Sequence, residues 1–130
     1  MTLQRLQGTL TKLNKLQNGV CTMRKYGVIG LGQVGATVAY TLVQQGIVDE
    51  LVLIDKNEAL ATAQKLDLDD ASARLSSTTK IILNDYSALA DAEVLIVASG
   101  NIAAIDMNSS KGRFGEYESN QAIVRDIAPK

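Results

Sequence analysis

The sequence predicts an α/β domain built on a doubly wound parallel sheet of about four strands, with helices on both faces. Short apolar runs alternate along the chain with segments that have helical spacing or helix-forming composition. Only short turns separate these segments, which favours right-handed crossovers and therefore a parallel sheet. The apolar runs also lack polar alternation, which is typical of strands covered on both faces.

The predicted elements follow one another in a regular order. The strands are expected at 26–30, 51–54, 80–83 and 94–97, and the helices at 33–45, 58–67 and 114–128.

The first strand and the first helix are separated by a glycine-containing turn. Tyr26–Gly30 is a short apolar run that ends in glycine. Val34, Val38 and Leu42 then recur at helical spacing, and Gly46 is a good stop signal.

The second strand and the second helix meet at an acidic residue. Leu51–Ile54 places four apolar residues in a row, and the run stops at Asp55. Asn57 is a suitable N-cap, and most of residues 58–67 are good helix formers. Ser76–Thr79 has the composition of a loop, and two more apolar runs follow it. Pro129 favours an end of the last helix near 128.

The composition excludes several classes of function. The 130-residue chain is 46% hydrophobic and 21% charged, which is typical of a globular protein. A net charge of −1 gives no electrostatic reason to expect nucleic acid, and no apolar run approaches the roughly 20 residues of a membrane-spanning helix. A single cysteine, Cys21, favours a reducing compartment such as the cytoplasm. We expect no metal site. Because the chain has no histidine, it cannot alone complete chemistry that needs an imidazole.

Residues 1–24 differ from the rest and are expected to be a separate, helical extension. They are basic without any acidic residue. Their leucines recur along one helical face, at Leu3, Leu6, Leu10, Leu13 and Leu16. The sequence leaves three interpretations open: an arm that buries these leucines, an organelle-targeting peptide, or an initiation at Met23 that would exclude the segment.

A glycine-rich turn follows the first predicted strand. The hexapeptide GLGQVG at 30–35 has the spacing G-x-G-x-x-G, between an expected strand and an expected helix. Gly30 permits the tight turn, Gly32 lets the backbone approach a diphosphate, and Gly35 lets the helix pack on the strand. The free amides around Gln33 and Val34 would then point at the phosphates.

This context indicates a Rossmann-type dinucleotide-binding fold. Because a full fold of this type has six strands, the four predicted here make an incomplete sheet. The fourth strand is expected beside the first, which leaves one of its edges unpaired.

Asp55 indicates which dinucleotide would bind. It ends the second strand, twenty residues beyond Gly35, where a carboxylate can accept hydrogen bonds from ribose hydroxyls. The same carboxylate repels the additional phosphate of NADP, so we expect NAD. Lys56 follows directly, and it leaves the strictness of this preference open.

Several later stretches resemble the L-lactate dehydrogenase superfamily. They are LDLDDA at 66–71, DYS at 85–87 and ADAEVLIVASG at 90–100. Gly100-Asn101-Ile102, with Arg113, Phe114 and Glu116 beyond, is most similar to the L-2-hydroxyisocaproate dehydrogenase branch. The resemblance implies that residues 25–130 are a truncated NAD-binding domain that includes the active-site loop.

The resemblance also implies roles for single residues. The glycine turn would bind the diphosphate of NAD, and Asp55 the adenosine ribose. Tyr86 would lie near the adenosine end of the cofactor, and Gly100 and Asn101 along the nucleotide. Arg113 corresponds to the arginine of a mobile loop that closes over the substrate and polarises its carbonyl group.

The positions of the positive charges in the loop at 100–113 indicate the kind of substrate. Relatives of the malate type carry an arginine early in this loop, whereas this loop has no positive charge before Lys111. We therefore expect a 2-oxo or 2-hydroxy acid with an apolar side chain. The acidic segment 67–70 resembles a dimer-contact helix, which implies a homo-oligomer. The acid–base histidine of the family would follow Lys130, so we expect this chain alone to bind NAD without turnover.

Three functions remain open at this point. The leading one is the amino-terminal part of an NAD-dependent L-2-hydroxyacid dehydrogenase. The second is a non-catalytic NAD-sensing module. The third is a flavin-binding domain, which shares the glycine turn and the acidic strand end.

Overall fold

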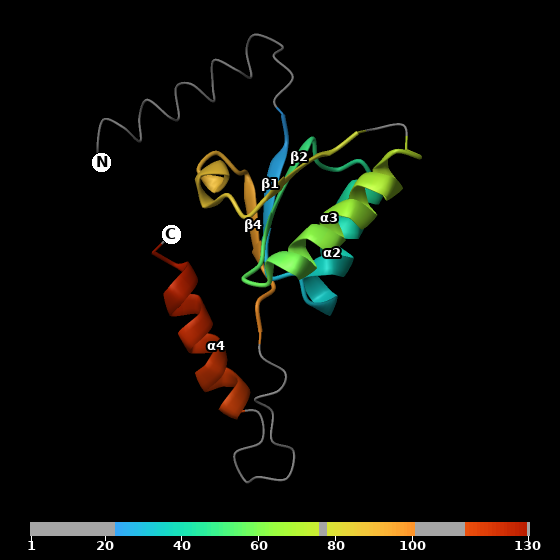
Figure 1. Cartoon of the computed structure of the whole chain (residues 1–130). Coiled ribbons are helices and arrows are strands. Elements are labelled where there is room, and N and C mark those ends of the chain that lie inside the picture. The colour runs from blue at the N-terminus through green and yellow to red at the C-terminus, as the bar shows by residue number, and fades with distance from the viewer. Residues whose placement is uncertain (1–22, 76–77, 101–113, 130) are drawn as a thin grey trace, which may run out of the picture.

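A computed structural model describes residues 23–75, 78–100 and 114–129 of the chain (Figure 1). Residues 1–22 of the expected helical extension lie outside the described residues, as do Asn101 and Arg113.

The predicted parallel sheet is confirmed. Its strands are β1 (Lys25–Ile29), β2 (Glu50–Ile54), β3 (Lys80–Leu83) and β4 (Val94–Val97). All neighbouring strands are parallel, and their order is β3-β2-β1-β4. β4 therefore lies beside β1, as expected, and within the described part of the chain its other edge pairs with no strand.

The helices α2 (Gln33–Gln44) and α4 (Phe114–Ile127) agree with the sequence prediction to within one residue, whereas α3 (Glu58–Ser72) and the short 3₁₀ helix η1 (Tyr86–Leu89) differ from it. α3 extends five residues beyond the expected end at 67, because Leu68 and Ser72 lie one turn apart on its buried face. η1 was not expected, and it begins where the Asp85 side chain accepts a hydrogen bond from the Ser87 amide at 3.0 Å.

The prediction of apolar strands covered on both faces is confirmed for β2 and for most of β1. It is wrong for the edge strand β4, where Val94, Leu95 and Val97 remain 39%, 51% and 49% exposed. Val28, Leu51 and Leu53 face α2 and α3 and are completely buried. Ile29 and Ile54 belong to a second cluster, which packs against η1 and the end of α4. Figure 1 shows α2 and α3 together on one side of the sheet and α4 on the other. Each fully buried leucine contributes about 2 kcal/mol through removal of its surface from water.

A chain of charges crosses the sheet at the amino ends of its strands. Lys25 of β1 lies 2.8 Å from Asp91 and 3.0 Å from Glu50 of β2, and Lys80 of β3 lies 2.9 Å from Glu50. Glu50 is opposite Lys25 in one strand pair and opposite Lys80 in the other. Because a slip of one residue would separate these charges, the ion pairs favour this register of the three strands.

The same contacts shift the titration of Glu50, which is buried to 8% exposure. Hydrogen bonds from Lys80 and then Lys25 hold the pKa of Glu50 below its ordinary value of 4.5. Since the folded state lowers this pKa, the carboxylate stabilises the fold fully above pH 4.5. That stabilisation is lost as the pH falls through the folded-state pKa.

The substitution Glu50→Gln tests this contribution. At neutral pH we expect it to lower the free energy of unfolding by about 1.5 kcal/mol, the lower end of the range for a hydrogen bond to a charged group. The difference from the wild type should shrink when the pH is well below 4.5. Urea unfolding followed by circular dichroism at both pH values measures it, with the exposed Glu93→Gln as control. A loss of equal size at both pH values would contradict the assignment.

Candidate functional site

The turn after β1 requires glycine at Gly30. Its φ of +93° lies in the region that L side chains rarely adopt. A Cβ atom here would lie 2.6 Å from the backbone nitrogen of Ser99, which follows β4. The Gly30 amide donates to the Ile54 carbonyl at 2.8 Å. The backbone therefore makes a sharp turn directly after β1, while its hydrogen bond to the end of β2 is kept.

Gly35 and Gly32 differ in what surrounds them. A Cβ atom at Gly35 would lie 1.8 Å from the carbonyl oxygen of Gly30, so the first turn of α2 packs directly against the turn. A Cβ atom at Gly32 would have no protein atom within 4 Å, and its φ of −66° is open to any residue. Packing thus explains Gly30 and Gly35, whereas Gly32 faces open space.

The amino end of α2 is arranged to receive an anion. Gly32 is the N-cap, no side chain caps the helix, and its first turn has no acidic residue. The first ladder bond of the helix runs from the Ala36 amide to the Gly32 carbonyl at 2.9 Å. The amides of Gln33 and Val34 precede that bond, and both residues are exposed. The positive end of the helix dipole therefore faces outward at this turn.

Asp55 lies directly against the glycine turn. Its Oδ2 accepts a hydrogen bond from the Leu31 amide at 2.7 Å, and its Oδ1 accepts one from the Asn57 amide at 2.8 Å. Because each carboxylate oxygen has two lone pairs, both can accept one further donor. Asn57 also caps α3 as expected, since its side chain accepts from the Leu60 amide at 3.1 Å.

Asn84 is a neighbour of this site that the sequence analysis missed. It follows β3, and its side-chain oxygen accepts a hydrogen bond from the Asp55 amide at 2.9 Å. Among the described residues it is the only one other than glycine with a positive φ, at 49°. An asparagine directly after a predicted strand is a signal for such a conformation, although not for this contact.

Tyr86 lies on the face of the sheet opposite α2 and α3. Gly100 lies beyond the carboxyl end of the edge strand β4. Tyr86 begins η1 and lines an apolar cavity of about 550 Å³, together with Ile29, Val97 and residues of α4. Gly100 follows β4 and is exposed. A Cβ atom at Gly100 would lie 3.7 Å from the Asn120 side chain of α4, which is ordinary contact.

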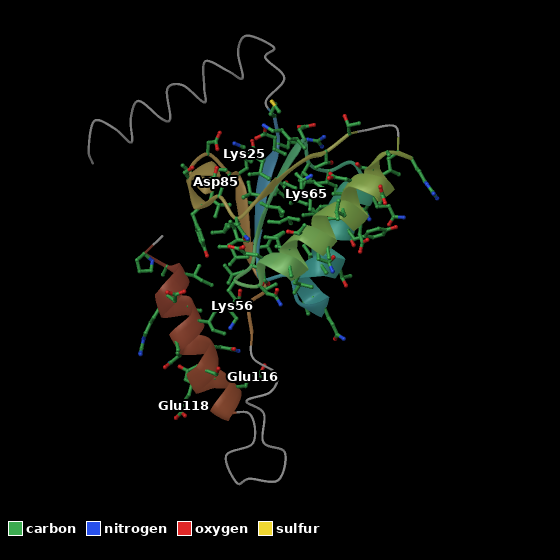
Figure 2. The ribbon with its side chains drawn as sticks, in the orientation of Figure 1. Lys25, Lys56, Lys65, Asp85, Glu116 and Glu118 are labelled. Atoms are coloured by element: carbon green, nitrogen blue, oxygen red, sulfur yellow. The ribbon has the colours of Figure 1, made fainter. Side chains whose placement is uncertain are left out.

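The structure thus brings most of the predicted cofactor residues to one edge of the sheet. Gly30, Asp55 and Gly100 follow β1, β2 and β4, so they lie at the carboxyl ends of adjacent strands. Figure 2 labels Lys56 at this end, and Lys25 at the opposite end. In open parallel sheets, ligands bind in the crevice outside the carboxyl ends of the strands.

Residues 23–75, 78–100 and 114–129 offer neither a metal site nor a membrane span. These residues contain no group of three or more His, Cys, Asp or Glu side chains that could hold a metal ion. They also include no helix that is long and apolar enough to span a membrane.

The similarity to known proteins covers most of the chain. The family model for the NAD-binding domain of lactate/malate dehydrogenase matches residues 24–130. An L-lactate dehydrogenase of Lactococcus lactis subsp. cremoris is 32% identical over 106 residues, which are 82% of this chain and 32% of that protein. The chain therefore spans about a third of the length of the curated relatives it matches.

Solved structures agree with this result. The lactate dehydrogenase of Cryptosporidium parvum, complexed with lactic acid and NAD, has a TM-score of 0.69 and 28% identity over 83% of this chain and 33% of its own. The malate dehydrogenase of Archaeoglobus fulgidus, in complex with NADH, has a TM-score of 0.68 and 34% identity over 81% of this chain and 35% of its own.

The expected membership of the L-lactate dehydrogenase superfamily is confirmed, while the hydroxyisocaproate branch stays a prediction. The chain has the glycine turn, the acidic residue Asp55 at the end of β2 and the four-stranded parallel sheet. One family model matches residues 24–130. The chain belongs to the NAD-binding domain family of the lactate/malate dehydrogenases.

Proposed function

We propose that this chain is the amino-terminal, NAD-binding part of an L-2-hydroxyacid dehydrogenase, and that NAD lies across the carboxyl edge of its sheet. The observation that carries this proposal is the 2.7 Å hydrogen bond from the Leu31 amide to Asp55 Oδ2. It joins an anion-receiving turn to a carboxylate, and a dinucleotide presents a diphosphate and a ribose side by side.

The diphosphate is assigned to the glycine turn. The open space at Gly32 lets a phosphate oxygen approach the main chain. The amides of Gln33 and Val34, at the uncapped end of α2, supply donors together with the helix dipole. Gly35 contributes indirectly, because it allows α2 to begin this close to β1.

The adenosine ribose is assigned to Asp55. Its two remaining acceptor positions suit two vicinal hydroxyl groups, and its negative charge disfavours a phosphorylated ribose. Tyr86 is assigned to the adenosine end, and Gly100 and Asn101 to the nucleotide beyond, on the basis of the family resemblance. The apolar cavity beside Tyr86 is compatible with a nucleobase, which is flat and largely apolar.

In the complete enzyme, the bound NAD supplies the group that accepts or donates a hydride at C2 of the substrate. We assign to Arg113 the stabilisation of the carbonyl oxygen as negative charge develops there. The absence of a positive charge in the loop before Lys111 favours a substrate with an apolar side chain, such as pyruvate or a branched 2-oxo acid. The 130 residues contain no histidine that could serve as the proton donor.

We also propose that the protein is a homo-oligomer in the cytoplasm. The resemblance assigns a subunit contact to the acidic part of α3, where Asp67 and Asp70 are exposed. Leu66 beside them is 61% exposed, so this helix presents apolar surface as well.

The variant Asp55→Ala tests the ribose assignment. Loss of charge-assisted hydrogen bonds should weaken NADH binding about 10-fold or more. The affinity for NADPH should not fall, because a repulsion disappears with the carboxylate. Titrations that follow NADH and NADPH fluorescence measure both. Asp55→Asn, which keeps the shape of the side chain, is the matched control for folding. Equal NADH affinity in wild type and Asp55→Ala would remove the assignment.

Two of the three glycines of the turn, Gly32 and Gly35, should respond differently to alanine. Gly35→Ala should lower the free energy of unfolding by about 3 kcal/mol or more, because the new methyl group overlaps a carbonyl oxygen. Gly32→Ala should leave the thermal unfolding curve unchanged and weaken NADH binding by about 10-fold, since its methyl group occupies the approach of the diphosphate. If Gly32→Ala binds NADH as the wild type does, the diphosphate lies elsewhere.

The chain on its own should bind NADH without oxidising it. With pyruvate or 2-oxoisocaproate as substrate, we expect no loss of NADH absorbance under conditions where fluorescence shows binding. The physical reason is the missing imidazole, which would have to donate a proton as the hydride is transferred. Turnover of either 2-oxo acid by the purified chain would show that another group donates the proton.

A further inference from the structure

Asn84 is the first residue after β3, and its backbone has an unusual conformation. Its φ of 49° is left-handed, a region in which asparagine is several-fold enriched over most other residues. The Asn84 amide donates to the Leu53 carbonyl at 2.9 Å and so makes the last main-chain bond between β3 and β2. After this bond the backbone of Asn84 turns away from β2.

The side chain of Asn84 replaces the next bond of the ladder. In a regular parallel pair, the amide two residues after Leu53 would donate to a main-chain carbonyl of the neighbouring strand. That amide belongs to Asp55, and it donates to Asn84 Oδ1 at 2.9 Å. The pairing of β2 with β3 therefore continues one step beyond the strands, through a side chain.

We propose that Asn84 is a positioning residue for the cofactor: it holds the backbone of Asp55 so that the carboxylate meets the adenosine ribose. This inference rests on the ribose assignment made above. Asp55 is then held at three points, since Asn84 accepts from its amide, Leu31 donates to Oδ2 and Asn57 donates to Oδ1. Only the first of these contacts comes from the residue directly after β3, so Asn84 ties the backbone of the ribose acid to the end of that strand.

The left-handed backbone of Asn84 and the acceptor on its side chain can be separated by substitution. Glycine adopts a positive φ without strain but has no acceptor for the Asp55 amide. Asn84→Gly therefore keeps the turn and removes only the contact to Asp55. Because the turn itself is preserved, we expect the variant to fold, with its melting temperature close to that of the wild type. Gln45→Gly, at the exposed end of α2, controls for the flexibility that any added glycine brings.

The test is a double-mutant cycle on NADH affinity in the 130-residue chain. Asn84→Gly alone should weaken NADH about 3- to 10-fold, as expected when a charged group is held less firmly. In the Asp55→Ala background the same substitution should change NADH affinity by less than about 2-fold, because there is no carboxylate left to position. Gln45→Gly should change it in neither background.

The outcomes separate this inference from the function on which it rests. If Asp55→Ala leaves NADH affinity unchanged, the ribose assignment fails. If Asp55→Ala weakens binding and Asn84→Gly does not, only the positioning role is overturned. A similar loss from Asn84→Gly in both backgrounds would also overturn it, because the effect would then be a general one on the fold.

Discussion

The hydrogen bond from the Leu31 amide to Asp55 Oδ2 makes one site out of two strand ends. It acts together with the bond from the Gly30 amide to the Ile54 carbonyl, so two successive amides of the turn are held by two successive residues at the end of β2. The Leu31 side chain is 1% exposed, which anchors the turn in the core as well. With these amides occupied inside the protein, the next ones, at the start of α2, are left facing outward, where a diphosphate can reach them.

This arrangement depends on the register of the sheet. β1 and β2 pair with Ile29 opposite Ile54, and that pairing brings the glycine turn beside Asp55. At the other end of the same strands, Lys25 is opposite Glu50, and Glu50 is opposite Lys80. The same register of β1 and β2 therefore places the ion pairs at the amino ends of the strands and the proposed cofactor site at their carboxyl ends. A shift of one residue would both separate the ion pairs and turn buried side chains to the wrong face.

Much of this could be predicted from the sequence, because the decisive signals are local. The apolar runs gave β3 and β4 with the observed bounds, and the glycine spacing followed by an acid located the turn and Asp55. Glu50 was not predicted to belong to β2, because the apolar pattern begins only at Leu51. Its place in the buried strand depends on Lys25 and Lys80, which reach it from two other strands. The contact of Asn84 was missed for a similar reason: whether a side chain replaces a main-chain acceptor depends on a neighbouring strand that is distant in sequence. Arg113 and Asn101 lie outside the described residues, so their roles stay predictions.

The most direct test of the central claim is an NMR titration of the ¹⁵N-labelled chain with NADH, in which each backbone amide reports on its own surroundings. A diphosphate at the turn and a ribose at the end of β2 predict that the largest shift changes occur at Gly32, Gln33 and Val34 and around Asp55. The amides at the opposite end of the sheet, such as those of Lys25 and Lys80, should change little. Changes concentrated at that opposite end, or saturation by NADH with no response at the turn, would contradict the account.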